Sequence, residues 1–250
     1  MNRRNQTTID EEVKFSTSQE LVSTTDLRGV ITYVNAEFAE IAGYSEEELV
    51  GKNHNIVRHP DMPKEAFMDL WKNLEKGLPW RGAVKNRCKD GRYYWVDAFV
   101  APVYQQSKLA GYQSVRTVLA TATRTRAETI YSALQANQYK EPWYVKGNNA
   151  TLVYAFVSLI LAIIAAFKVP LVALLLPIIP FILFKHALID TPNYFAGLRQ
   201  EYDSISRYVF SGHKPFGIAD FHMKIQEGKV KTILGRVQDS AKSLTQRTNN

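Results

Sequence analysis

The chain has 250 residues, enough for one or two domains. Hydrophobic residues make up 46% of it and aromatic residues 12%, which excludes a chain that is disordered along its whole length. A net charge of +7 suits an anionic partner, either nucleic acid or a membrane surface. One cysteine, Cys88, excludes an internal disulfide bond. The first residues are polar and no apolar run follows them, so we expect no secretory signal peptide.

Strand and helix patterns follow one another through residues 19–118. The helix predicted over 64–76 carries apolar residues at helical spacing and is followed by Gly77. This order of elements predicts an α+β fold, with a five-stranded antiparallel sheet and helices on one face. The expected strands are 20–25, 29–34, 80–87, 93–103 and 109–118, and the expected helical stretches are 35–43, 45–51 and 64–76.

Residues 53–63 concentrate polar chemistry in one stretch, Asn-His-Asn-Ile-Val-Arg-His-Pro-Asp-Met-Pro. Pro60 and Pro63 restrict the backbone around the polar groups. Arginine, histidine and aspartate offer hydrogen bonds and charge to a polar or phosphorylated ligand. The stretch has no nucleophile and no metal-ligand spacing, so we predict neither catalytic nor metal-ligating residues.

Short runs spread over the domain carry a family resemblance: 23–27, 58–63, 66–71, 80–82, 84–87, 94–96 and 111–116. The region 19–118 resembles a PAS domain, and in detail it resembles the PAS domain of aerotaxis receptors, which are membrane-bound redox sensors. The run 58–63 is the specific part of this resemblance. The resemblance implies a domain that binds FAD non-covalently and senses redox state, and not an enzyme.

A pocket for FAD needs aromatic surface for the flavin ring, and cationic or amide groups for its polar edge and tail. The sequence supplies both types, and the resemblance assigns most of them. The resemblance implies that FAD contacts Arg58, His59, Asp61 and Trp80. It also implies that Asn35, Phe67 and Asn86 line the pocket or affect signalling. Trp71 adds aromatic surface.

These residues also have ordinary structural interpretations. Phe67 and Trp71 on a helix suit a packed core, and Trp80 at a strand start suits simple packing. Asp61 could cap the next helix or pair with Arg58. Only the combination of these residues points to a cofactor.

Other chemistries use the same fold, and the fold alone does not choose among them. A photoreactive flavin domain needs a cysteine where this chain has His54, and Cys88 lies far from that place in the sequence. A haem pocket needs an axial ligand, for which His54 and His59 are available. The alternatives to a FAD sensor are therefore a haem or small-ligand sensor and a cofactor-free dimerisation module. The sequence shows no nucleophile–base pair and no dinucleotide-binding glycine motif, which disfavours an enzyme.

Residues 150–186 are strongly apolar. An uncharged run, 151–167, precedes Lys168, and a second one, 169–184, follows it. A membrane-spanning helix needs about 20 apolar residues, with a lower limit of about 17. Lys168 and Pro170 suit a tight turn, so we predict a transmembrane hairpin, with a single span or a buried soluble hairpin as alternatives. Both ends of a hairpin would lie in the cytoplasm, as the cationic flanks and the resemblance imply.

The tail from residue 187 is polar and helical in pattern. Apolar residues at heptad spacing between Met223 and Leu244 predict a dimeric coiled coil, with an ordinary amphipathic helix as the alternative. We expect a homodimer in the bacterial inner membrane and no nucleic-acid partner, since no helix-turn-helix pattern is present. The resemblance implies signalling to chemotaxis proteins through a region absent from this chain. The predicted division is a cap over 1–18, the sensor domain over 19–118, a helical linker over 119–149, the membrane hairpin over 150–186 and a cytoplasmic helical segment over 187–250.

Overall fold

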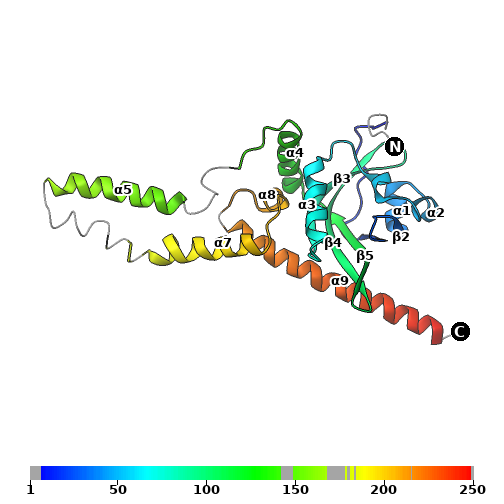
Figure 1. The fold of residues 1–250 in the computed structure, drawn as a ribbon. Helices are drawn as coiled ribbons and strands as arrows, with labels where there is room; N and C mark the ends of the chain where they lie inside the picture. Colours follow the sequence, from blue (N-terminus) through cyan, green and yellow to red (C-terminus); the bar gives the residue numbers. More distant parts are fainter. Residues whose placement is uncertain are drawn as a thin grey trace. The chain divides into compact units, whose positions relative to one another are not determined.

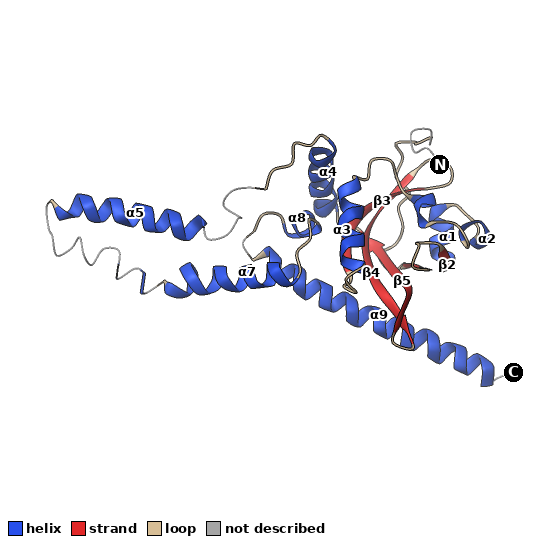
Figure 2. Ribbon diagram, in the orientation of Figure 1, coloured by secondary structure: helices blue, strands red, loops and turns tan. Residues whose placement is uncertain are grey.

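The computed structural model describes residues 7–141, 149–167, 178, 181–182, 184–214 and 216–248. The chain divides into two compact units. The first consists of Met1–Tyr139, Ser204–Phe210 and Met223–Asn250, and the second of Lys140–Asp203 and Ser211–His222. Figure 1 follows the chain through its elements, and Figure 2 separates the sheet from the helices.

The sheet of the first unit has five antiparallel strands in the order β2-β1-β5-β4-β3. The strands are β1 (Leu21–Thr25), β2 (Ile31–Val34), β3 (Trp80–Arg87), β4 (Tyr93–Gln105) and β5 (Lys108–Val118). β5 is central and pairs with both β1 and β4, so the first and last strands of the domain lie side by side. The predicted five-stranded antiparallel sheet is confirmed, with β3 at its expected bounds.

Three helices and a 3₁₀ turn connect β2 to β3. These are α1 (Ala36–Ala42), α2 (Glu46–Leu49), η2 (His54–Val57) and α3 (Lys64–Leu74). Asn35 starts α1 because its Oδ1 accepts from Phe38 N at 3.2 Å, and Gly43 ends it with a φ of 72°. The turn η2 is not predicted from the sequence; Asn53 starts it, accepting from Asn55 N at 3.1 Å.

Side chains along a strand alternate between the two faces of a sheet. Ala98 and Ser114 face a cavity bounded by α3, whereas Phe99 and Val115 face the side on which α9 (Gly217–Thr248) packs. Gly228 of α9 permits this close packing, since a Cβ there would lie 2.4 Å from the Phe99 ring. The sheet is therefore covered on both faces within the first unit, whereas the sequence predicted helices on one face only.

Two other segments of the first unit pack against the domain. One is α4 (Thr121–Gln135), and the other is Ser204–Phe210, which contains most of α8 (Ser206–Ser211). Arg126 of α4 holds the second segment, because its guanidinium donates to the carbonyls of Val209 at 2.8 Å and Phe210 at 2.7 Å.

The N-terminal arm lies along the start of β4 over its described residues. Ile9 N donates to Gly91 O at 2.8 Å, and Val13 N donates to Tyr93 O at 2.7 Å. The arm also reaches α4, where Glu12 forms an ion pair with Arg124 at 2.7 Å. Backbone and side-chain contacts thus fix the arm to the domain.

The second unit is helical in its described part. It contains α5 (Asn149–Ala166), the π-helical turn η4 (His186–Asp190) and α7 (Thr191–Glu201). After α7, the ring of Tyr202 stacks on Phe221 with ring centres 5.9 Å apart, and His222 Nε2 donates to Tyr202 O at 2.8 Å.

Among the residues that the structure describes, no helix is both long enough and apolar enough to cross a membrane. The hairpin predicted over 150–186 lies partly outside those residues, at 168–177, 179–180 and 183. The later heptad positions, from Leu234 onward, lie on α9, but their side chains are outside the described part.

Candidate functional site

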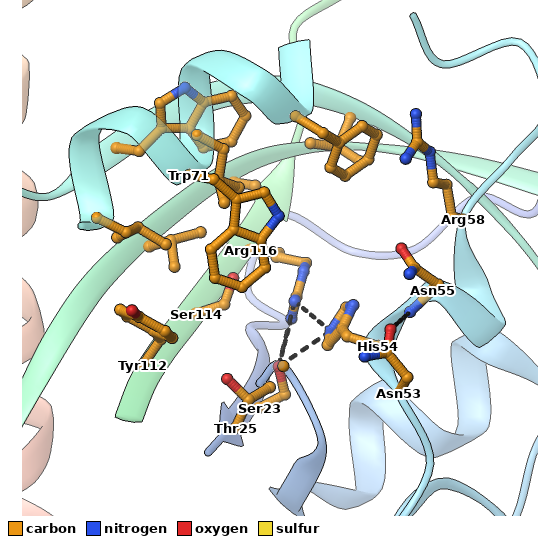
Figure 3. A pocket seen from close by; sticks show the side chains of 18 of the residues that line it. Ser23, Thr25, Asn53, His54, Asn55, Arg58, Trp71, Tyr112, Ser114 and Arg116 are labelled. Atoms are coloured by element: carbon orange, nitrogen blue, oxygen red, sulfur yellow. Dashed lines mark hydrogen bonds between the residues drawn. The ribbon is translucent and has the colours of Figure 1, made fainter. Parts of the chain in front are cut away.

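A cavity of about 330 Å³ lies between the inner face of the sheet and the helices. This volume is within the usual range of ligand pockets, roughly 300–1,000 Å³. Strands β1, β3, β4 and β5 supply one wall, α3 supplies the opposite wall, and the segment around η2 closes one side. Figure 3 shows most of the side chains that line it.

The α3 wall is mainly apolar. Phe67 and Trp71 line the cavity from α3 together with two leucines. Trp71 meets Tyr112 of β5 edge to face, with ring centres 5.6 Å apart. Arg58 lies over the Phe67 ring at 3.7 Å, which places a cation at the end of this wall.

Trp80 enters the cavity from the start of β3 and is only 1% exposed. Gly82 makes room for its indole, since a Cβ at position 82 would lie 1.9 Å from the ring. The indole Nε1 donates to Asp69 Oδ2 of α3 at 2.7 Å. Packing and one hydrogen bond therefore fix the orientation of this ring.

The sheet wall carries a buried cation, Arg116 of β5, which is 4% exposed. Both of its terminal nitrogens lie 3.1 Å from Ser23 Oγ, which accepts from them, and one lies 2.7 Å from His54 Nε2 (Figure 3). Burial lowers the pKa of Arg116 to about 10, so the guanidinium remains charged at neutral pH.

His54 is held neutral beside this cation. Burial, and then the charge of Arg116, lower the pKa of His54 to about 3. Because Arg116 only donates, His54 Nε2 must accept its hydrogen bond and Nδ1 must carry the proton. The ring of Phe38 stacks on His54, with ring centres 5.9 Å apart.

Two buried polar groups of the sheet wall have no partner among the described residues. Asn86 Nδ2 and Ser114 Oγ both belong to residues that line the cavity, and neither makes a hydrogen bond of normal geometry. Such groups are rare in native proteins and call for an explanation such as a bound water, ion or ligand. With Arg116 nearby, they give the sheet wall an excess of hydrogen-bond donors.

The predicted site residues separate into two groups. One group lines the cavity, and the other lies outside it. Lining the cavity are Arg58, Phe67, Trp71, Trp80 and Asn86; outside it are Asn35, His59 and Asp61.

Asn35 uses its side chain to connect local elements. Its Oδ1 accepts from Val22 N at 2.9 Å, and its Nδ2 donates to Glu20 O at 2.8 Å. These bonds join β1 to the start of α1, so the amide is directed at the backbone and not at the cavity.

His59 and Asp61 shape the loop next to the cavity. His59 is buried against the Tyr93 ring, and its Nδ1 accepts from Asp61 N at 3.1 Å. Burial, and then the charge of Lys85, lower the pKa of His59 to about 4. Asp61 pairs with Lys85 at 2.7 Å, and α3 begins without a side-chain cap, so Asp61 does not cap that helix.

The cavity also contains polar residues that the sequence did not predict as flavin contacts. They are Ser23, His54, Ser114 and Arg116. One sequence pattern could have identified two of them. Side chains alternate between the two faces of a strand, so Tyr112, Ser114 and Arg116 of β5 lie on one face. An arginine on the inward face of a central strand is unusual enough to mark a site.

Cys88 lies outside the cavity and donates to Ile41 O at 3.3 Å. Burial raises the pKa of its thiol to about 11, which makes it a weak nucleophile. In the described part of the chain, no group of three or more histidine, cysteine or acidic residues is placed to hold a metal ion.

Residues 31–116 match the family model described as PAS fold. This region is therefore a PAS domain, the class that its sheet order and cavity define. The chain is 48% identical over 118 residues to the aerotaxis receptor of Escherichia coli strain K12, covering 47% of this chain and 23% of the receptor. It thus carries a PAS domain of the aerotaxis-receptor type.

A second relative is the nitrogen fixation regulatory protein of Klebsiella pneumoniae, 34% identical over 96 residues, covering 38% of this chain and 19% of that protein. The chain thus spans less than a quarter of the length of these relatives. A solved light-oxygen-voltage domain, studied with a flavin analogue, is 21% identical with a TM-score of 0.40, covering 49% of this chain and 91% of that one. At that TM-score the likeness carries no argument about this chain.

Proposed function

We propose that this chain is a membrane-anchored signalling sensor whose PAS domain binds FAD non-covalently and reports redox or oxygen state, as in aerotaxis. It binds and signals, and it does not catalyse turnover. One observation carries the proposal: the cavity combines an aromatic wall with a wall of buried donors that lack protein partners.

This arrangement suits a flavin ring, which is flat and apolar on its faces and carries hydrogen-bond acceptors along its edge. Phe67, Trp71 and Trp80 would contact the faces of the ring. Asn86 and Arg116 would donate to its edge. When bound, the flavin supplies reversible electron uptake. The protein binds and orients it and excludes water.

The three predicted residues outside the cavity act through their neighbours in this proposal. His59 and Asp61 hold the loop that carries Arg58, and Asn35 holds β1 against α1. Their replacement would weaken FAD binding by moving the wall, without loss of a direct contact.

The alternatives fit the cavity less well. A haem needs a free imidazole nitrogen as an axial ligand. His54 lines the cavity, but its Nε2 already accepts from Arg116 at 2.7 Å. A cofactor-free dimerisation module leaves Asn86 Nδ2 and Ser114 Oγ buried without partners.

Membrane anchoring rests on the segment 150–186. The described part of α5 has no charged residue, and large apolar side chains such as Leu152, Phe156 and Ile164 are exposed along it. A hairpin here would keep the PAS domain and the tail on the cytoplasmic side of a bacterial inner membrane. Its partners would be a second copy of the chain and chemotaxis signalling proteins, by analogy with the aerotaxis receptor.

The test is an absorption spectrum of the gently extracted, detergent-solubilised protein before and after dithionite. We expect flavin bands that bleach on reduction.

Trp71→Ala should lower the affinity for FAD by roughly tenfold, since an aromatic contact contributes about 0.5–1.5 kcal/mol beyond its buried area. Met68→Ala is the control, because Met68 lies on the same helix and is exposed. A haem spectrum, or no chromophore after addition of FAD, would overturn the proposal.

A further inference from the structure

The charge of Arg116 has no counter-charge in the described part of the chain. Its hydrogen bonds go to Ser23 Oγ, His54 Nε2 and, at 3.5 Å, Leu21 O, all of which are neutral groups. It takes part in none of the ion pairs between described residues. A buried charge is strongly destabilising unless an opposite charge or a full set of hydrogen bonds compensates it.

The titratable groups nearest to Arg116 do not supply that charge. The low pKa of His54 keeps it neutral, and burial raises the pKa of Tyr94 so that its phenol stays protonated. The Phe38 ring, 5.0 Å from the guanidinium, offers only a weak cation–π contact.

The groups beside Arg116 also favour an electron-rich occupant. Asn86 Nδ2 makes no hydrogen bond of normal geometry, although Asn86 lies close enough to the Tyr94 phenol to oppose the rise in its pKa, and Ser114 Oγ is free to donate. This wall therefore presents one full positive charge together with uncommitted donors. Preorganised groups of this kind stabilise negative charge strongly in a site that excludes water.

We propose that Arg116 stabilises the negative charge that the bound flavin gains on reduction, and thereby raises the midpoint potential of the cofactor. This inference rests on the proposed function. Two electrons from a reduced electron carrier and one proton from solvent give a reduced ring with one negative charge. No bond of the protein forms or breaks. Ser23 and His54 position the guanidinium.

A purely structural role for Arg116 is the competing explanation. Its bonds to Ser23 and Leu21 connect β1 to β5 and would support the fold in any case. A structural arginine affects stability but has no reason to change the ratio between the affinities for reduced and oxidised flavin. The midpoint potential therefore separates the two roles.

The experiment is a dithionite titration of the full, detergent-solubilised chain loaded with FAD. Arg116→Gln should lower the ratio of reduced to oxidised affinity at least tenfold, a fall of about 30 mV for a two-electron couple. Arg116→Lys should keep most of the wild-type potential, because it keeps the charge. Arg92→Gln is the matched control, because Arg92 does not line the cavity and its charge is paired with Asp90.

Each outcome decides a different point. A wild-type protein that binds no FAD overturns the proposed function and this inference with it. A wild-type protein that binds FAD, with an equal potential in Arg116→Gln, overturns the inference alone. If Arg116→Gln does not fold, Ser23→Asp serves in its place, because it places a carboxylate beside the guanidinium and compensates its charge. An unchanged potential in Ser23→Asp would then contradict the inference.

Discussion

His54 and His59 are both neutral in the folded protein, for partly different reasons. Burial dominates in each case, but the second cause is Arg116 for His54 and Lys85 for His59. An unfolded chain has neither burial nor these neighbours, so both imidazoles there titrate near their ordinary pKa of about 6.5. The two histidines therefore connect the stability of the domain to pH.

The free energy of unfolding should fall as the pH is lowered below about 6.5. The folded-state pKa values of His54 and His59 are about 3 and about 4, so the unfolded chain binds more protons between those values and 6.5. Each histidine contributes a slope of up to about 1.4 kcal/mol per pH unit. Urea unfolding at a series of pH values should show a flatter slope for His54→Gln. Met68→Gln, at an exposed residue without a titratable group, should keep the wild-type slope. Equal slopes in wild type and His54→Gln would contradict this prediction.

Gly82→Ala should destabilise the PAS domain and weaken FAD binding together. The added methyl would overlap the Trp80 indole, with 1.9 Å between the Cβ and the ring. Overpacking of this kind costs roughly 1–3 kcal/mol. Urea unfolding and FAD titration measure the two effects. Gly197→Ala on α7 is the control, because a Cβ there meets nothing within 4 Å. Unchanged stability in Gly82→Ala would show that Trp80 moves aside freely.

At the scale of elements, α3 connects the cavity to a segment far along the chain. Asp69 of α3 accepts from Trp80 Nε1 at 2.7 Å and from Ser204 Oγ at 2.5 Å, both at the same oxygen. Trp80 lines the cavity, and Ser204 begins the segment Ser204–Phe210. The Asp69 carboxylate therefore connects a residue that lines the cavity to the segment Ser204–Phe210.

Asp69→Ala should destabilise the protein more than Ser204→Ala. The first change leaves the buried Trp80 Nε1 without a partner, which costs about 1–3 kcal/mol, and it also removes the acceptor of Ser204. The second removes the Ser204 hydroxyl, which donates to Asp69 and accepts from Ser206 N at 3.1 Å, but it leaves Trp80 bonded. Hydrogen exchange of the amides in Ser204–Phe210 should rise in both variants. FAD affinity should fall only in Asp69→Ala. Equal losses of stability in the two variants would contradict the proposed sharing of this carboxylate.

The elements of the PAS domain were predictable because each rests on local patterns. The alternation in β3 and the apolar stripe of α3 are visible in the sequence, and the Asn35 cap and Gly43 stop use local hydrogen bonds. The turn η2 was missed because its four residues are too few to show an apolar period.

The cavity was predictable only in part, and the missed residues show why. Arg58, Phe67 and Trp71 sit on or beside one helix, so their spacing alone brings them together. Arg116 and Ser23 meet only through the pairing of β1 with β5, which no local pattern specifies. Asn35 has the polar character of a pocket residue, but backbone groups of β1 use its amide.

At the scale of the whole molecule, the net charge of +7 and the apolar segment 150–186 are two separate arguments for the proposed membrane anchor. An electrostatic contact is screened over about 3 Å at about 1 M salt, whereas an apolar anchor is not. We expect the chain to remain in the membrane fraction after a high-salt wash. Release by salt alone would contradict an apolar anchor.

A charge placed in α5 gives a second test of the anchor. Ile160→Lys should reduce membrane retention, because a lysine at the centre of an inserted helix costs about 2.5–3.5 kcal/mol. Leu27→Lys is the control, since Leu27 is exposed in the first unit and the net charge changes equally. Fractionation followed by detection of the protein in pellet and supernatant measures the effect. Equal retention of both variants would contradict a role for α5.

The contact between Ser23 and Arg116 joins residues 93 positions apart, which also affects the order of events during biogenesis. Contacts of such sequence separation form late, because a long loop must close before they can contribute. The charged wall is therefore complete only once the last strand has been synthesised and paired with the first. A ligand that depends on this wall binds only to a finished domain and then shifts its folding equilibrium. The proposed cofactor would thus bind only after the domain has folded. Its binding would stabilise the folded domain and would not guide the first steps of folding.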